Sequence, residues 1–128
     1  MRSCVAISTT TAPKLEGVAT AIGGGPPLVR DGKVVGHDQT KVRHPRTAIG
    51  WNKSEFFLVE VDGRQRYLSV GMTIEELADY MAKLGCEEAM CLDGGGSATC
   101  WVNGQVMNSP SEGHERGMAN ALILVHKK

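Results

Sequence analysis

The segment Cys91-Leu92-Asp93-Gly94-Gly95-Gly96-Ser97-Ala98-Thr99 places an acid, three glycines and two hydroxyls directly after a short apolar run. Consecutive glycines cost backbone entropy and add nothing to packing, so folded chains keep them where φ is positive or where a ligand approaches the backbone. We predict a buried strand over 89–92, with Asp93 at its carboxyl end and several free N–H groups in a concavity beside Ser97 and Thr99. Such a concavity suits an anion such as phosphate; a plain glycine-rich turn is the alternative.

The size and charge of the chain limit what else it can be. Its 128 residues fit a single domain, 1–128, that buries its own core. The 14 Lys and Arg balance the 14 Asp and Glu, so no overall field favours nucleic acid or an anionic membrane, and any anion site must be local. No apolar run approaches the roughly 20 residues that span a bilayer. The apolar part of the N-terminus is too short for a signal peptide, and the compartment is left open.

The chain has four cysteines, Cys4, Cys86, Cys91 and Cys100, which allow three disulfide pairings. Their spacing lacks a CxxC pair and no histidine lies close in sequence, which disfavours zinc. We expect reduced thiols that pack as small apolar side chains, with a single bridge as the alternative.

Residues 73–84 are predicted to form a helix. Thr73 and Glu76 make a capping box, and Gly85 provides a stop. The apolar side chains of this segment fall on one helical face, which should pack on a sheet: Ile74, Leu77, Ala78, Met81 and Leu84. With the strands below, this predicts an α/β (α+β) fold with a mixed sheet and one packing helix.

A second strand end resembles the first. A strand over Pro45 to Trp51 is followed by a turn at 52–54 and an apolar strand over 56–61, which ends in Asp62-Gly63-Arg64. Ligands gather outside the carboxyl ends of strands, because loops there bring side chains from several segments together. We therefore expect Arg46, Asp62, Arg64 and Asp93 near one site.

Turn residues predict the remaining connections. The segment 23–27, which contains three glycines and two prolines, must bend sharply. Taken alone it is best interpreted as a surface turn, and a second wall of the same pocket is the alternative. Asp31-Gly32 and Asn103-Gly104 predict hairpins, the second pairing 98–102 with 105–108. A final apolar strand is expected from Ala119 to His126, and Arg116 stands just before it, where a loop would bring it to the rim of the sheet.

These motifs together resemble the phosphodiester glycosidase family. The resemblance runs from about Gly17 to Val125 and rests on motifs in a fixed order: Arg46-Thr47-Ala48-Ile49-Gly50, Val61-Asp62-Gly63-Arg64, Gly71-Met72-Thr73, Glu76-Leu77-Ala78, Leu92 to Thr99, Asn108, and Glu115-Arg116. It implies a mixed α/β domain that hydrolyses a sugar-1-phosphodiester, in proteins that are mostly secreted or lumenal.

The resemblance also implies roles for individual residues. The phosphate of such a substrate is already a good leaving group, so the enzyme must control charge more than donate a proton. Guanidinium groups match phosphate oxygens in pairs. The clamp and the substrate contacts would come from Arg46, Arg64, Arg116, Gly94, Gly95, Gly96, Ser97, Thr99 and Asn108. Asp93 is the first choice as nucleophile or base, with Asp62 and Glu115 as the other catalytic carboxylates.

Several of these residues have simpler interpretations. Arg46 could only form an ion pair with Asp93 or Asp62, Asp62-Gly63 could be only a turn, and Glu115 could only orient Arg116. We expect His44 and His114 on the surface, and Trp51 and Trp101 in the core rather than stacked on a sugar. No cofactor is expected; Ca²⁺ or Mg²⁺ held by Asp62 with Asp93 is the alternative.

The family carries a further segment ahead of the matched part, and nothing like it stands before Gly17. We expect a fragment, a reduced form, or a sheet completed by self-association or by a partner chain, since an open sheet edge has to be covered. The expected partner is a sugar phosphate or glycan, with no nucleic acid and no membrane span. A non-catalytic phosphosugar-binding module and a structural domain remain the alternatives to an enzyme.

Overall fold

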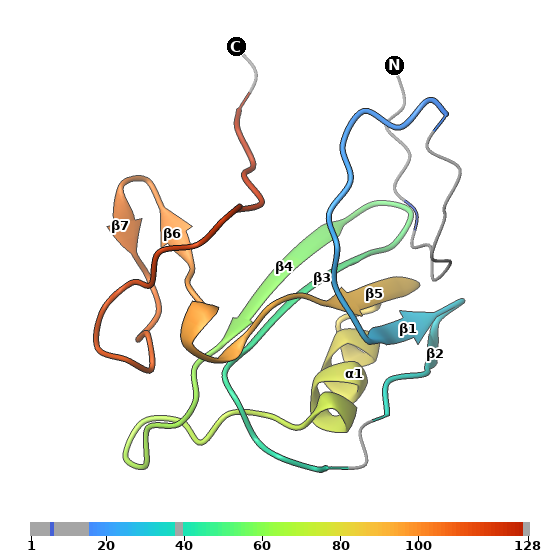
Figure 1. Ribbon diagram of the computed structural model, residues 1–128. Coiled ribbons are helices and arrows are strands. Elements are labelled where there is room, and N and C mark those ends of the chain that lie inside the picture. The colour runs from blue at the N-terminus through green and yellow to red at the C-terminus, as the bar shows by residue number, and fades with distance from the viewer. Residues whose placement is uncertain (1–5, 7–15, 38–39, 127–128) are drawn as a thin grey trace.

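A five-stranded sheet with strand order β2-β1-β5-β3-β4 forms the centre of the computed structural model (Figure 1). The structure describes residues 6, 16–37 and 40–126. The elements, in chain order, are β1 Pro27–Arg30, β2 Lys33–Val34, β3 Arg46–Trp51, β4 Phe56–Val61, helix α1 Ile74–Lys83, β5 Glu88–Cys91, the 3-10 turn η1 Gly95–Ser97, and the small hairpin of β6 Trp101–Val102 and β7 Gln105–Val106.

The α+β class is confirmed, but the sheet is not mixed. Each of its four strand pairings is antiparallel: β1 with β2, β1 with β5, β3 with β4, and β3 with β5. β5 pairs with β3 and β1, neither of which directly precedes it in the chain. Short apolar strands do not encode the direction of such distant partners, which is why the predicted mixed sheet is wrong.

The register brings several strand ends to one edge of the sheet. β3 runs antiparallel to both β4 and β5, so the carboxyl ends of β4 and β5 flank the start of β3, where Arg46 faces Val61. β1 starts at the same edge, with Pro27 opposite Met90. The segments that follow β4 and β5 and that precede β1 and β3 therefore meet there. We call this the site edge.

Helix α1 packs on one face of the sheet, as predicted. Its buried residues are Ile74, Leu77, Ala78 and Met81, which join Leu28, Val29, Ala48 and Ala89 in the core. The helix approaches β3 so closely at Gly50 that a Cβ there would lie 2.7 Å from both Met81 Cε and Cys86 Sγ. Side chains that alternate along β3 then divide the sheet into a helix face, which includes Ala48, and an outer face, which includes Thr47 and Ile49.

The capping box at the start of α1 is confirmed. The Thr73 hydroxyl accepts a hydrogen bond from the Glu76 N–H at 3.2 Å, and the Glu76 carboxylate accepts one from the Thr73 N–H at 3.0 Å. The carboxylate also pairs with Arg43, and its hydrogen bonds lower the pKa of Glu76. This end of the helix lies beside the site edge, since Ile74 lines the cavity described below.

We expect Thr73→Ala to lower the free energy of unfolding by about 1 kcal/mol, because it removes one half of the capping box. Thr73→Ser keeps the hydroxyl and should retain most of that stability. Urea unfolding of the three proteins measures the difference. Equal stability of the alanine and serine variants would contradict the role given to the cap.

Two turn predictions are confirmed and one strand prediction is wrong. Asp31-Gly32 connects β1 to β2, with φ of 49° and 70°. Asn103-Gly104 connects β6 to β7, with φ of 49° and 92°. The expected strand from Ala119 to His126 does not form. A strand needs a neighbour for its backbone groups, and no ladder with this segment exists within the described part of the chain. Ile123, Leu124 and Val125 are instead 72%, 67% and 82% exposed.

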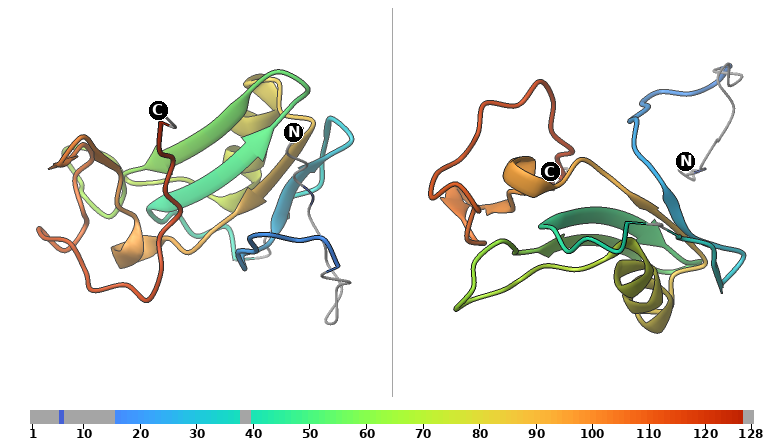
Figure 2. Two further views of the ribbon diagram at one scale, coloured as in Figure 1. Left: turned by 90° about the horizontal axis from the view of Figure 1, so that it is seen from above. Right: turned by 60° about the horizontal axis from the view of Figure 1, so that its bottom comes forward.

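The outer face of the sheet is covered differently from the helix face. Figure 2 shows α1 on one side of the sheet, with η1, the β6–β7 hairpin and the C-terminal segment on the other. Residues 117–122 of that segment line a cavity together with β3 and β4. Where the structure describes the chain, it contains no helix with the length and apolar character needed to cross a membrane.

Candidate active site

A cavity of about 770 Å³ opens at the site edge. Six separate parts of the chain contribute to its wall: Gly23 to Pro26, His37, His44 with Arg46, Arg64, Ile74, and Cys91 to Gly95. Residues 23–26 therefore line the same cavity as the glycine run after β5, so the simpler interpretation of this segment as a surface turn is wrong. It is held there by hydrogen bonds on both sides of Cys91, from Gly25 N–H to Cys91 O at 2.7 Å and from Cys91 N–H to Pro26 O at 3.0 Å. We call this the first cavity.

Arg46 enters the first cavity from the start of β3. Its Nε donates to Met72 O at 2.9 Å and its Nη2 donates to Val42 O at 3.0 Å. A guanidinium has five N–H donors, so these two carbonyls fix its orientation and leave donors for a ligand. Among the described residues it forms no ion pair with a carboxylate. The simpler interpretation, a salt bridge to Asp93 or Asp62, is therefore wrong.

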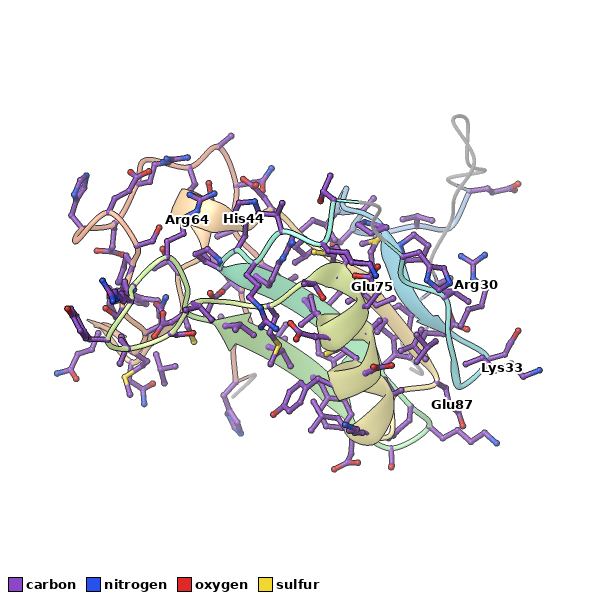
Figure 3. All side chains as sticks on the ribbon, turned by 90° about the horizontal axis from the view of Figure 1, so that it is seen from below. Arg30, Lys33, His44, Arg64, Glu75 and Glu87 are labelled. Carbon is purple, nitrogen blue, oxygen red and sulfur yellow. The ribbon has the colours of Figure 1, made fainter. Side chains whose placement is uncertain are left out.

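Arg64 reaches the first cavity from the turn after β4. Its Nε donates to His44 Nδ1 at 3.3 Å, and its Nη2 lies 3.2 Å from the same nitrogen, so the two side chains lie together (Figure 3). The guanidinium also lies against the backbone of Gly95, where a Cβ would come within 3.1 Å of Nη2. Arg64 has a φ of 58°, a strained conformation for a residue with a side chain, which is typical of functional sites.

His44 is a site residue that sequence reasoning missed. It was expected on the surface, but it is partly buried, lines the first cavity and contacts Arg64. A guanidinium only donates, so Nδ1 of His44 is the acceptor in its contact with Arg64. The pattern His44-Pro45-Arg46, a histidine fixed by proline beside a site arginine, was the available signal. His114, by contrast, is exposed as expected.

The glycine run offers fewer free N–H groups than predicted. The N–H of Gly95 donates to Pro45 O at 2.9 Å, and that of Ser97 donates to Gly94 O at 3.1 Å. The 3-10 turn η1 uses the Ser97 N–H within the run, and contact of the run with the segment before β3 uses the Gly95 N–H. Gly94 and Gly95 line the first cavity, but Gly96 is buried away from it. The cationic side chains must therefore supply most of the attraction for an anion.

Asp93 lies between two cavities. It lines the first cavity and also a second one, of about 490 Å³, on the outer face of the sheet. Ser97 and Thr99, which were expected to bind phosphate beside the glycines, line this second cavity instead, because η1 turns the chain across the sheet edge. Trp101 lines it too and is 62% exposed, so the expectation of core packing is wrong for Trp101. Trp51 stacks on Phe56.

Asp62 and Asn108 hold the loop after the glycine run. The Asp62 carboxylate accepts from the N–H of Ser109 at 2.9 Å and from the Asn108 side-chain amide at 3.1 Å. Asn108 also donates to Ala98 O and accepts from the N–H of Cys100. Neither residue lines the first or the second cavity. This arrangement attaches residues 98–109 to the end of β4.

Arg116 lies next to the glycine run but outside both cavities. It pairs with Glu112, four residues earlier in the chain, rather than with Glu115, which is exposed. A Cβ on Gly96 would lie 2.5 Å from Arg116 Nη2 and 2.4 Å from Glu112 Oε1. The absence of a side chain at Gly96 therefore leaves the space that this ion pair occupies. Arg46 and Arg64 therefore line the first cavity, whereas Arg116 packs against Gly96, outside the cavity.

Glu60 is a second site residue that sequence reasoning missed. It lines the second cavity from β4, where Oε2 accepts from the Thr47 hydroxyl at 2.8 Å. Burial, with a smaller contribution from the charge of Asp62, raises the pKa of Glu60 from 4.5 to about 7. A single acid within the apolar strand Phe56-Phe57-Leu58-Val59-Glu60-Val61 was the signal that could have identified it.

The described residues contain no group of three His, Cys, Asp or Glu side chains that could hold a metal.

The raised pKa of Glu60 predicts a pH dependence of stability. Between about pH 4.5 and about pH 7 the folded protein binds more protons than the unfolded chain, so the free energy of unfolding falls as the pH rises through this window. We expect Glu60→Gln to remove this loss, which is on the order of 1 to 2 kcal/mol because the carboxyl keeps some contact with water.

Urea unfolding at pH values on either side of this window measures the effect. Glu87→Gln, at an exposed residue outside both cavities, is the matched control and should leave the pH profile unchanged. A Glu60→Gln profile parallel to that of the unmodified chain would show that the Glu60 carboxyl is not desolvated.

Comparison with known sequences identifies a family profile that matches nearly the whole chain and individual relatives that match parts of it. The sequence profile of the phosphodiester glycosidase family matches residues 2–125. The N-acetylglucosamine-1-phosphodiester alpha-N-acetylglucosaminidase of Homo sapiens is 31% identical over 109 residues, which are 77% of this chain and 21% of that protein. An uncharacterized prophage-derived protein of Bacillus subtilis is 37% identical over 84 residues, 65% of this chain and 13% of that protein.

Solved structures also include relatives of this chain. The catalytic domain of the zebrafish N-acetylglucosamine-1-phosphodiester alpha-N-acetylglucosaminidase, auto-inhibited by its pro-peptide, superposes with a TM-score of 0.61 and 30% identity over 70% of this chain and 34% of that one. A putative exported protein of Burkholderia pseudomallei has a TM-score of 0.51 and 48% identity over 54% of this chain and 13% of its own. The chain therefore spans only about a third or less of the length of these relatives.

Proposed function

This chain belongs to the phosphodiester glycosidase family, and we propose that it hydrolyses the bond between the anomeric carbon of a sugar and a phosphodiester. One observation carries the proposal. Arg46, Arg64 and Asp93, from three separate segments, line one cavity at the site edge. Cations that hold a phosphate and a carboxylate that faces the anomeric carbon are the two groups that this reaction needs.

The phosphate would bind in the first cavity. The chain as a whole has no net charge at pH 7, so attraction for an anion has to come from local cations. Arg46 is oriented by two backbone carbonyls and Arg64 by His44, so little side-chain freedom is lost when an anion binds. Fixed donors of this kind stabilise the negative charge that develops on the phosphate as the bond breaks.

Asp93 would act on the sugar. It follows β5 directly and lines both cavities, so its carboxylate can face an anomeric carbon attached to a phosphate in the first cavity. A carboxylate in this position stabilises the oxocarbenium-like centre, attacks it, or activates the water that attacks it. Because the phosphodiester is a weak base, its departure requires little proton donation. Asp62, which holds Ser109, and Arg116, which lies against Gly96, would support this site from outside it.

Hydrolysis of matched substrates tests the proposal. The purified chain is incubated with the 1-(methyl phosphate) diesters of glucose and of N-acetylglucosamine, and with the corresponding methyl glycosides, and the release of reducing sugar is measured. We expect release from at least one diester and none from the methyl glycosides, which lack the phosphate. Equal release from both kinds of substrate would show that the arginines do not hold a phosphate.

A phosphosugar-binding module is the alternative function, since the same arginine-lined cavity would suffice for binding. It predicts that a sugar 1-phosphate raises the melting temperature while no diester is hydrolysed at any protein concentration. A ligand at 100 times its Kd stabilises the folded state by about 2.7 kcal/mol, a shift that thermal unfolding detects. A structural domain would show neither effect.

We propose an extracytoplasmic location, on the likeness to a protein described as exported. The three cysteines among the described residues are free thiols, and Cys4 lies outside those residues. Burial raises the pKa of the Cys86 and Cys91 thiols, which keeps them protonated and slow to oxidise. Free thiols at these two positions are therefore compatible with an oxidising compartment.

A further inference from the structure

The second cavity differs in chemistry from the first. It lies on the outer face of the sheet, between β3 and β4 on one side and residues 117–122 on the other. No lysine or arginine is found among the described residues that line it, whereas Arg46 and Arg64 line the first cavity. The two cavities share Gly23, Leu92 and Asp93, so they meet at the carboxyl end of β5. An anion is favoured in the first cavity and a neutral ligand in the second.

Two buried polar atoms belong to the wall of the second cavity. Oε1 of Glu60 and Oγ1 of Thr99 are buried and have no hydrogen-bond partner among the described residues. A buried polar atom without a partner costs free energy, so such atoms in a cavity wall favour a ligand that can pair with them. Glu60 has a raised pKa and is partly protonated near neutral pH, when it can donate as well as accept. Hydroxyl groups are suitable partners for both side chains.

An aromatic ring and apolar side chains complete the wall. Trp101, which is 62% exposed, lines the second cavity together with Leu58 and Met118, which are 47% and 46% exposed. A large indole that is left exposed beside polar groups is typical of a binding surface, because it offers rigid apolar area at low cost in entropy. A pyranose ring has an apolar C–H face and a rim of hydroxyls, which matches an indole with carboxyl and hydroxyl groups around it.

We propose that the second cavity binds the neutral sugar ring, with Trp101 against its C–H face and with Glu60 and Thr99 hydrogen-bonded to its hydroxyls. This inference rests on the proposed function, since it divides one substrate between two cavities: phosphate on the helix side of the sheet edge and sugar on the outer face. The glycosidic bond would then pass Asp93, the only acidic residue among the described ones that lines both cavities. Recognition of the sugar is thereby separated from recognition of the phosphate.

Binding of the two halves of the substrate tests this division. The probes are inorganic phosphate and the methyl glycosides of glucose, N-acetylglucosamine, galactose and mannose, each titrated by NMR into the unmodified chain and its variants. We expect Thr99→Val and Trp101→Ala each to weaken binding of a methyl glycoside about tenfold and to leave phosphate binding unchanged. Arg64→Ala should weaken binding of phosphate and leave binding of the methyl glycoside unchanged. Thr20→Val, at an exposed residue outside both cavities, is the matched control for Thr99→Val.

Because Trp101 is exposed, its substitution keeps the test valid if Thr99→Val fails to fold. Methyl glycoside binding that is lost in Arg64→Ala but kept in both other variants would overturn the inference. So would hydrolysis of a diester by a chain that binds no methyl glycoside, although the proposed function would then stand. Glycoside binding that depends on Thr99 and Trp101, without hydrolysis of any diester, would support the second cavity as a sugar site and remove the proposed function.

Discussion

Asp93→Asn is expected to lower the turnover of a sugar-1-phosphodiester by about three orders of magnitude while the fold is retained. The amide has the same shape as the carboxylate but cannot attack the anomeric carbon, take a proton from water or balance an oxocarbenium charge. Asp93 is exposed at the end of β5, so the change removes no buried contact and should alter the free energy of unfolding by no more than about 0.5 kcal/mol.

Initial rates and urea unfolding of the same preparations separate chemistry from stability. Asp79→Asn provides the control, because Asp79 is an exposed carboxylate on α1 that lines neither cavity. Its turnover should match that of the unmodified chain. An Asp93→Asn variant with undiminished turnover would exclude Asp93 as the reacting carboxylate and direct attention to Glu60, the other acid in the second cavity.

Arg64→Ala is expected to lower turnover by about two to three orders of magnitude, because it removes a fixed cation from the developing charge on the phosphate. Phosphate binding should weaken with it. Arg64→Lys should restore little of the loss: an ammonium group keeps the charge but lacks the planar fork that matches two phosphate oxygens and contacts His44.

Arg66→Ala is the matched control for this prediction. Arg66 is two residues further along the same turn, but it is exposed and its guanidinium lies 5.8 Å from the ring centre of Tyr67, outside the first cavity. Rates and phosphate affinity should be unchanged in this variant. Equal losses in the two variants would mean that the turn contributes only general positive charge and that Arg64 has no specific place in the site.

Local signals in the sequence predicted the elements that depend on neighbouring residues. The capping box of α1 and the hairpins at Asp31-Gly32 and Asn103-Gly104 are short-range interactions that the residues themselves specify. The direction of the strands and the fate of residues 119–126 depend on distant partners instead. An apolar run such as Ala121-Leu122-Ile123-Leu124 is compatible with a strand, but the strand forms only where another strand offers unpaired backbone groups.

The candidate site was predictable as far as strand ends determine it. Arg46, Arg64 and Asp93 each lie at the start or just after the end of a strand, and the register of β3 with its two neighbours brings them to one edge. For residues that follow the glycine run, the sequence did not predict on which side of the sheet they lie. One 3-10 turn placed Ser97 and Thr99 in the second cavity, and glycines allow many such turns.

The position of the bond that breaks tests the central claim most directly. A sugar-1-phosphodiester is hydrolysed in water enriched in the heavy isotope of oxygen, and the products are analysed by mass spectrometry. If Asp93 directs attack at the anomeric carbon while the arginines hold the phosphate, the label appears on the sugar and the released phosphate monoester carries none. Label on the phosphate would mean attack at phosphorus, and it would contradict the assignment of this chain as a glycosidase.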